Sequence, residues 1–279
     1  MNRRLARRVV SAAECLLFSK TAARLELLAA SVGKGDALLL RAGECVCLID
    51  AGKAEAWERL SRVFERCGIG ALDAVFLTHT DRDHAGGLKR LRKSGVEIRA
   101  IYASRWHPEV KDKKHPAVKA ARKLGLDVRW LGAGDEVALG DAGAVLRVVA
   151  PIRAIAGNDD DNSLVMLLDA PDGRILFTGD MEEDEEALLL ASGAELRCDV
   201  LKVPNHGGSD ACSAALIGAC APKVAVISTD SAEKPDTPDK RVLDDLDRAG
   251  CVTYVTENCT LGVRVVLEEG RVTADYVNW

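Results

Sequence analysis

Four side chains that commonly bind metal ions lie within six residues of one another: His79, Asp81, Asp83 and His84. They directly follow residues 74–78, a short apolar run that is typical of a buried strand. A metal ion needs several deprotonated nitrogen or oxygen donors that converge on one point, and a loop held by a rigid strand can supply them. The spacing predicts a metal site; the alternative is a polar surface turn with Asp–His hydrogen bonds.

Three further apolar runs also end in a polar side chain. Asp50 follows Leu48-Ile49, Asp180 comes three residues after Phe177, and His206 lies in the glycine-containing turn after residues 200–203. Any one of these residues could be a helix cap or a turn residue. Their recurrence at the ends of separate runs favours a shared site.

The elements that position these residues can be outlined from apolar periodicity. Because adjacent strands alternate with strands separated by helices, we expect mixed αβ layers without a dividing linker. Strands are expected at 24–32, 37–41, 45–50, 74–78, 145–150, 163–169, 174–178, 199–203 and 224–228, helices at 54–66, 88–93, 182–191, 211–219 and 239–249, and a last hairpin at 252–256 and 262–267.

Composition narrows the class of protein. The net charge of −5 over 279 residues argues against indiscriminate binding to nucleic acid or anionic membranes. Nine scattered cysteines without a CxxC pair favour buried thiols in a reducing compartment, so we expect a cytoplasmic protein. No apolar stretch reaches the roughly 18 residues of a transmembrane segment.

The first 23 residues carry arginines followed by an apolar stretch, which superficially resembles a signal peptide. Glu14 interrupts the stretch and no clear cleavage site follows. Apolar residues recur at helical spacing, so we expect an amphipathic leader helix in residues 1–23 and a hydrolase domain in residues 24–279.

The ordered motifs of the chain resemble those of the metallo-β-lactamase superfamily, and specifically the soluble hydrolase domain of ComEC-type DNA-uptake proteins. The resemblance covers about residues 24–268 and implies an α/β fold, a four-layer αβ/βα metallo-β-lactamase sandwich with the metal site along one edge. The motifs are Val32–Ala37, Ile49–Gly52, His79–His84, Asp161–Val165, Phe177–Asp180, Asp199–Ser209 and Pro222–Ser228.

The resemblance also implies two divalent metal ions, Zn²⁺ or Mn²⁺, with Mg²⁺ as a third candidate. Asp81 stands where most of the superfamily has His, and a carboxylate there makes the site harder. His79 and Asp81 would hold one ion, Asp83 and His84 the other, Asp180 would bridge them, His206 would complete one of them, and Asp36, Asp50 and Ser163 would support these ligands.

A dinuclear site lowers the pKa of a bridging water, so the expected nucleophile is a metal-activated hydroxide. Asp83 could orient it while acting as a ligand. Asn205 replaces the first His of the family's His-His-Gly-Ser motif, which puts catalytic efficiency in doubt. Asn162 could hydrogen-bond the substrate or a bound water, or equally cap a strand. Asp83, Asn162 and Asn205 are therefore the catalytic candidates.

A basic segment indicates the substrate. Thirteen Lys or Arg residues and only four acids lie between Lys89 and Arg129. Lysine and arginine bind phosphate backbones, and a Trp can stack on a base; a solvated helix face is the alternative. The residues expected to bind substrate are Lys89, Arg105, Trp106, Lys113 and Lys114.

We therefore expect a metal-dependent phosphodiesterase or nuclease acting on DNA or nucleotides, either alone or together with a separate partner protein. Two alternatives remain open. One is a metallohydrolase of a small ester, lactone or phosphocholine-like compound, and the other is a non-catalytic module that retains metal. The sequence makes no prediction of oligomeric state.

Overall fold

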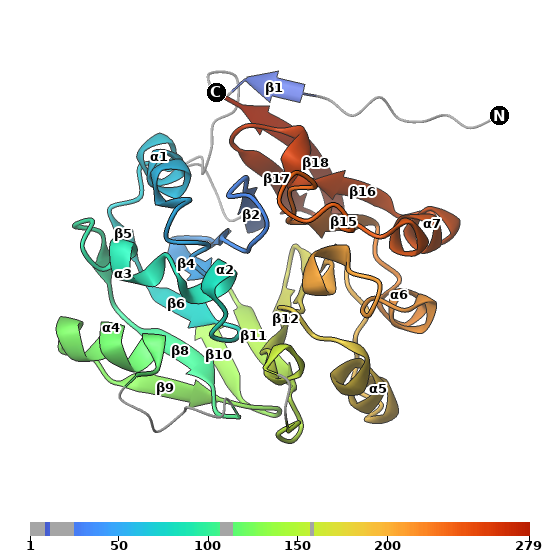
Figure 1. The fold of residues 1–279 in the computed structure, drawn as a ribbon, viewed down its shortest axis with the longest axis horizontal. Helices are drawn as coiled ribbons and strands as arrows, with labels where there is room; N and C mark the ends of the chain where they lie inside the picture. Colours follow the sequence, from blue (N-terminus) through green and yellow to red (C-terminus); the bar gives the residue numbers. More distant parts are fainter. Residues whose placement is uncertain (1–8, 12–24, 107–113, 157–158) are drawn as a thin grey trace.

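The computed structural model of the chain describes residues 9–11, 25–106, 114–156 and 159–279. Two large sheets dominate it (Figure 1). The first has the strand order β1 (Val9–Ser11), β18 (Arg271–Asn278), β17 (Gly262–Glu268), β2 (Leu25–Ala30), β3 (Leu38–Ala42), β4 (Cys45–Ile49), β6 (Ala74–Leu77), β8 (Ile101–Ser104), β9 (Val128–Leu131). The second has the order β10 (Glu136–Leu139), β11 (Ala144–Ala150), β12 (Val165–Ala170), β13 (Gly173–Phe177), β14 (Val200–Lys202), β15 (Val224–Ile227), β16 (Val252–Val255), and β5 (Ala71–Leu72) pairs separately with β7 (Glu97–Ile98).

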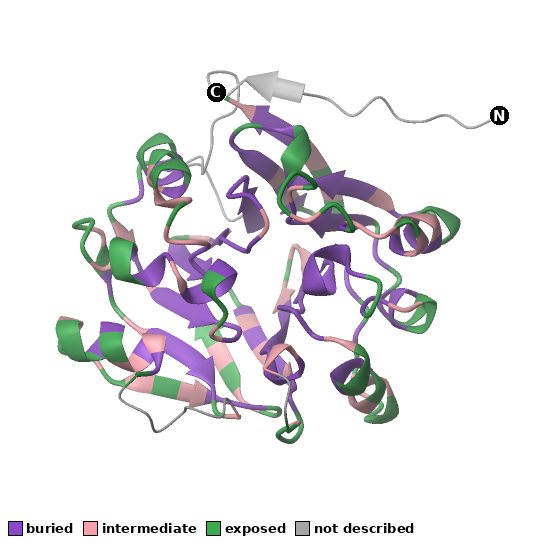
Figure 2. Ribbon diagram, in the orientation of Figure 1, coloured by how far each residue is buried: buried purple, intermediate pink, exposed green. Residues whose placement is uncertain are grey.

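The two sheets pack face to face, and helices cover their outer faces. Phe76 of the first sheet and Phe177 of the second belong to one buried cluster between the sheets. The exposed sides of the helices face outward and their buried sides face the sheets (Figure 2). The expected four-layer sandwich is confirmed. The first sheet carries α1 (Trp57–Cys67), α2 (Arg82–Ala85), α3 (Leu88–Leu91) and α4 (Pro116–Leu124), and the second α5 (Glu183–Ala191), α6 (Ala214–Cys220) and α7 (Lys240–Arg248).

Local sequence explains why these elements form. In α1, Leu60, Val63 and Phe64 recur on one buried face, and Gly68 ends the helix with a φ of 65° that suits glycine. Strands β4 and β6 are buried along their whole length, because helices cover one face of the sheet and the second sheet covers the other. They therefore read as unbroken apolar runs rather than alternating ones.

The hairpin expected near the C-terminus is wrong. Strand β16 pairs in parallel with β15 in the second sheet, whereas β17 belongs to the first sheet and pairs with β2 and β18. Strand β18 was not expected, although polar and apolar residues alternate from Arg271 to Tyr276 as in a half-buried strand. Short connections link β16 to β17 and β17 to β18 alike, so proximity in the chain does not reveal that β17 lies in the other sheet from β16.

Within the expected leader helix, the structure describes only Val9–Ser11, and these residues form a strand parallel to β18. The helix is therefore not formed at these three positions; residues 1–8 and 12–24 lie outside the described part. Among the described residues, every helix is too short or too polar to cross a bilayer.

The parallel strands bring separate loops to one edge of the sandwich. Strands β4, β6 and β8 run parallel in the first sheet, and β13, β14 and β15 run parallel in the second. The residues that follow the carboxyl ends of parallel strands therefore meet at the edge between the sheets. Asp50, His79, Asp180 and His206 all occupy such positions.

Candidate metal centre

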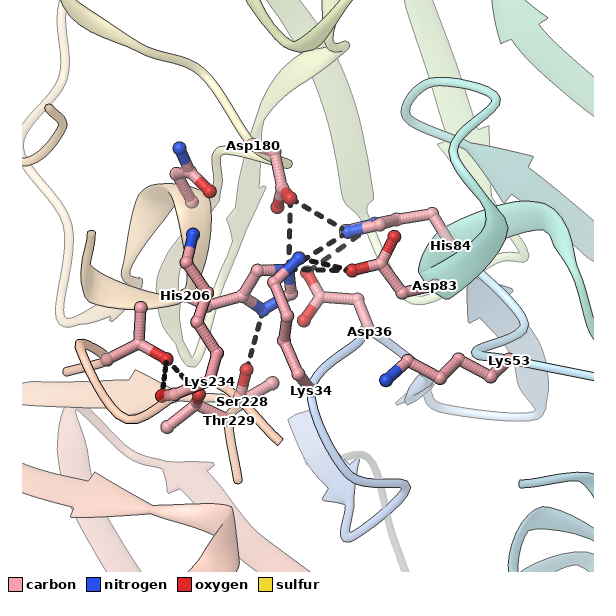
Figure 3. A network of polar contacts seen from close by, with 12 residues as sticks. Lys34, Asp36, Lys53, Asp83, His84, Asp180, His206, Ser228, Thr229 and Lys234 are labelled. Atoms are coloured by element: carbon pink, nitrogen blue, oxygen red, sulfur yellow. Dashed lines mark hydrogen bonds and ion pairs between the residues drawn. The ribbon is translucent and has the colours of Figure 1, made fainter. Parts of the chain in front are cut away.

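Asp83, His84, Asp180 and His206 form the centre of this edge. Asp83 and His84 belong to α2, Asp180 follows β13, and His206 lies in a 3₁₀ turn, η2 (Pro204–Gly207), after β14. Their side chains point toward one another (Figure 3). Asp180 Oδ2 lies 2.9 Å from His206 Nε2 and 3.1 Å from His84 Nε2. One donor atom from each of the four lies within 4.8 Å of the others.

A second group of donors shares Asp180. His79 Nε2 lies 3.5 Å from Asp160 Oδ1, and His79, Asp160 and Asp180 each offer a donor atom within the same 4.8 Å limit. Asp160 belongs to a short 3₁₀ turn, η1 (Asp160–Asn162), that precedes β12. Asp160 is not among the ligands that the sequence predicts. The sequence signal that could have identified it is its position shortly before the apolar run of β12.

The protonation of two histidines is fixed by their outer neighbours. His206 Nδ1 donates to the Ser228 carbonyl oxygen at 2.6 Å, and His84 Nδ1 donates to Asp50 Oδ2 at 2.8 Å. When Nδ1 of a neutral ring carries the proton, Nε2 is unprotonated and its lone pair is available to bind a metal ion. The two Nε2 atoms face each other at 3.2 Å. Such a pair of lone pairs is stable only with a shared proton or a cation between them.

His79 is oriented in the same way. The Thr78 hydroxyl donates to Asp50 Oδ2 at 2.6 Å, so its oxygen is left to accept from His79 Nδ1 at 3.0 Å. Ser163 Oγ lies 3.3 Å from the same ring nitrogen and accepts from the Asp180 amide. His79 Nε2 is buried and makes no hydrogen bond within the described residues. Such a directed, unsatisfied nitrogen fits a metal ligand.

The charges at the site favour ionised carboxylates. Burial alone would raise the pKa of Asp180, but His206 and His84 hold this pKa well below its usual range. Burial opposes the charge on His84, yet Asp180 and Asp50 raise the pKa of its imidazole well above the ordinary value. A metal ion must therefore compete with a proton at His84, and metal affinity falls as pH is lowered.

The pKa shifts in the second donor group differ from those in the first. Burial and the neighbouring His84 lower the pKa of His79, which keeps this imidazole neutral and ready to bind a metal. Burial and then the Asp180 and Asp81 carboxylates raise the pKa of Asp160 to about 7. Three carboxylates thus repel one another beside His79. A divalent cation would relieve that repulsion.

Two lysines extend into this region. Lys34 forms an ion pair with Asp83 Oδ2 (Figure 3). Lys202, which has no exposed surface, lies 2.8 Å from Asp36 Oδ2 and donates to the Val203 carbonyl oxygen at 2.9 Å. Asp36, Asp50 and His84 form a third group of close donors, but the Lys202 ammonium already supplies the cation there.

The backbone is bent to bring the ligands inward. Asn205 and His206 have φ angles of 41° and 54°, which are uncommon for residues with a side chain. Gly179 has a φ of 54°, and a Cβ there would lie 2.8 Å from Ser163 Cβ. Two tight turns thus allow Asp180 and His206 to reach the same point.

Some expected residues lie elsewhere. Asp81 is exposed at the start of α2 and belongs to none of the close donor groups in the described chain. The amide oxygen and nitrogen of Asn162 bind the backbone of Ile155, at 2.9 and 2.7 Å, which favours the structural alternative. Asn205 is near the centre, and its amide donates to Glu182 and Asp210 at 2.8 and 3.1 Å.

Two of the residues expected to bind substrate make contacts within the protein. Arg105 forms an ion pair with Asp135, and Trp106 Nε1 donates to the Pro151 carbonyl oxygen at 3.1 Å. These contacts hold the two side chains against the protein. Lys89 and Lys114 are exposed, and Lys113 lies outside the described residues.

The family model of the metallo-β-lactamase superfamily matches residues 30–231, which is more than half of the chain. The chain belongs to the metallo-β-lactamase superfamily. It is 28% identical over 235 residues to ComE operon protein 3 of Bacillus subtilis, covering 78% of this chain and 30% of that protein. It is also 28% identical over 215 residues to competence protein ComA of Neisseria gonorrhoeae, covering 75% of this chain and 28% of that protein.

The expected resemblance to competence-type metallo-β-lactamase proteins is thereby confirmed, although the chain spans less than a third of the length of these two relatives. A solved metallo-β-lactamase fold protein, YhfI of Bacillus subtilis, superposes with a TM-score of 0.54 at 13% identity. The superposition covers 91% of this chain and 100% of YhfI, and it shows a shared fold.

Behind the metal edge, α5 contains a buried carboxyl group whose ionisation opposes folding. The Glu185 side-chain oxygens have no hydrogen-bond partner within the described residues. Burial, followed by the charge of Asp161, raises the pKa of Glu185 well above its model-peptide value of 4.5. Glu185 therefore stays protonated in the folded protein at pH values where the unfolded chain ionises it.

This difference makes the folded state lose stability as pH rises above about 4.5, by at most about 1.4 kcal/mol per pH unit for this group. In thermal melts, the melting temperature of Glu185→Gln relative to the native chain should therefore rise from pH 5 to about pH 7. Glu183→Gln, at an exposed position of the same helix, is the control and should show no such trend. A pH-independent difference for Glu185→Gln would contradict this interpretation.

Proposed function

We propose that the chain is a metal-dependent phosphodiesterase that acts on DNA or nucleotides. The observation that carries the proposal is the convergence of three oriented imidazoles with Asp83, Asp160 and Asp180 at one buried edge of a metallo-β-lactamase fold. Superfamily membership supports hydrolysis in general. The competence-protein relatives and the resemblance to ComEC-type hydrolase domains support a nucleic-acid substrate.

We assign Asp83, His84 and His206 to one metal ion and His79 and Asp160 to the other, with Asp180 shared between them. The donor atoms lie 2.9 to 3.6 Å apart, close enough for one ion to be held by several of them at once. Three nitrogen and three oxygen donors suit Zn²⁺ or Mn²⁺. Asp160 replaces Asp81 in the expected ligand set, and Asp81 remains at the rim.

Divalent ions held in this way lower the pKa of a bound water and offset negative charge on the oxygens of a reacting phosphodiester. The chain's own residues fix the geometry. Asp50 and the Ser228 carbonyl hold the rings of His84 and His206, while Thr78 and Ser163 hold that of His79. Such outer contacts keep ligands in position before substrate arrives.

Two further side chains would meet the substrate. The Lys34 ammonium reaches Asp83 from a loop beside the site, and it can pair with a phosphate oxygen when Asp83 binds metal. Asn205 stands where relatives of this type have His; its amide would have to release Glu182 or Asp210 to hydrogen-bond a leaving group, and it cannot protonate one efficiently. We therefore expect modest turnover. A separate partner protein stays a prediction.

Hydrolysis of bis-(p-nitrophenyl) phosphate tests the proposal. Metal-stripped protein should be inactive, and Mn²⁺ or Zn²⁺ added singly should restore turnover. The Asp83→Ala/His84→Ala variant removes two assigned ligands and should stay inactive with every metal. Absence of turnover with Mn²⁺, Zn²⁺ and Mg²⁺, in protein shown to bind them, would refute the proposal.

A further inference from the structure

A basic groove lies between α3 and α4, on the surface beside the metal-binding helix α2. The two helices pack side by side (Figure 1) and enclose a cavity of 740 Å³. Of the ten described residues that line it, five are Lys or Arg and none is acidic. The five are Lys89, Arg92, Lys119, Arg122 and Lys123.

The positive charge of this groove is not neutralised by carboxylates of the described residues. Within the described part of the chain, none of the five basic side chains forms an ion pair. By contrast, Arg62, Arg99 and Arg105 of the same half of the molecule each pair with a carboxylate. A cluster of unpaired cations in an acidic protein concentrates an anion at this place. Charge complementarity therefore indicates a polyanionic ligand.

The walls of the groove are close in sequence to the metal ligands. Ala85 lines it and directly follows the ligand His84, and Lys89 comes on the next helical turn. The opposite wall begins at Pro116, the first residue of α4. Helix α4 follows β8, whose carboxyl end lies on the same edge as that of β6 and His79. The groove is therefore bordered by elements that directly adjoin the metal ligands in the chain.

The chemistry of the lining favours a nucleic-acid backbone over bases. Ala85, Leu88 and Val118 give an apolar floor between the cations, and no aromatic side chain of the described residues lines the cavity. Bases that are bound individually usually stack on aromatic rings, whereas phosphates need only Lys and Arg. His84, Asp180 and His206 are almost completely buried, so a flexible single strand can bring a polymer's phosphodiester to them more readily than a rigid duplex can.

We propose that this groove binds the phosphodiester backbone of a single-stranded nucleic acid, independently of its sequence, and leads it to the metal centre. The proposal rests on the proposed phosphodiesterase function and names the surface that holds a polymeric substrate. It replaces Arg105 and Trp106 as the expected binding residues, because contacts with Asp135 and Pro151 already hold both side chains.

The test measures binding without turnover. Fluorescence anisotropy would measure how a labelled oligo(dT) of about twelve nucleotides binds to the metal-loaded chain. Its phosphorothioate linkages keep the backbone charge and resist hydrolysis. The Lys119→Glu/Lys123→Glu variant should raise the Kd at least about tenfold at low salt. The slope of log Kd against log salt should fall by about 1.4 or more, because each lost single-strand phosphate contact contributes about 0.7.

The matched control is Arg59→Glu/Arg66→Glu on α1, which changes net charge equally at two exposed positions. It should change the Kd by less than about threefold at low salt, because these residues lie outside the groove. An equal loss in both variants, no loss in the α4 variant, or no binding by the native chain would overturn the groove proposal. Groove-dependent binding without hydrolysis of any phosphodiester would refute the proposed function and leave the groove intact.

Discussion

Replacement of Asp180 with Asn is expected to lower metal-dependent hydrolysis of bis-(p-nitrophenyl) phosphate by more than about 100-fold. Asp180 is the one residue common to both donor groups at the candidate centre in the described chain. Its carboxylate contacts two histidines and balances their charge, whereas an amide has a single acceptor oxygen and no charge. Loss of a supporting contact costs about 10- to 100-fold, so loss of a shared ligand should cost more.

The measurement is kcat together with the number of metal ions retained after dialysis. Asp127→Asn, an exposed change on the surface, is the control and should leave both quantities unchanged. If Asp180→Asn keeps its metal ions and its kcat within about tenfold of native, Asp180 is not a ligand and the assignment fails.

The second large effect concerns stability. Lys202→Met leaves Asp36 as a buried charge without its cation, because the Lys202 ammonium lies 2.8 Å from this carboxylate. Breaking such a buried pair costs about 3 to 5 kcal/mol, which corresponds to a fall in melting temperature of roughly 6 to 20 °C for a chain of this size. Thermal or urea unfolding of the metal-stripped protein measures it without the contribution of bound metal.

The double variant Lys202→Met/Asp36→Asn removes both charges and should recover most of the lost stability. Lys223→Met is the surface control, because it breaks the ion pair between an exposed lysine and Asp199. It should lower the free energy of unfolding by less than about 1 kcal/mol. A double variant less stable than Lys202→Met would show that the ion pair is not the source of the effect.

The fold and part of the site could be predicted because their signals are local. Buried parallel strands appear in the sequence as unbroken apolar runs. His84, Asp180 and His206 could be predicted as site residues because they lie shortly after such runs end. The change of sheet between β16 and β17 could not be predicted, because it depends on long-range pairing with β2.

The finer assignments depend on side-chain direction, which spacing does not determine. Asp81 and Asp83 are two residues apart in one motif, yet Asp81 points to solvent at the start of α2 while Asp83 is buried. Asp160 reaches the site from a turn 77 residues after Asp83 in the chain. The Lys202–Asp36 pair is equally non-local, and Lys202 reads only as an interruption of an apolar run.

The most direct test of the central claim compares two substrate classes on the same metal-loaded protein. The metal-dependent acceleration over the uncatalysed reaction would be measured for bis-(p-nitrophenyl) phosphate and for p-nitrophenyl acetate, with Asp180→Asn as the blank for both. The account predicts a large acceleration for the phosphodiester that disappears in Asp180→Asn, and a much smaller one for the carboxylic ester. Acceleration of the ester alone would contradict it and identify a different metallohydrolase.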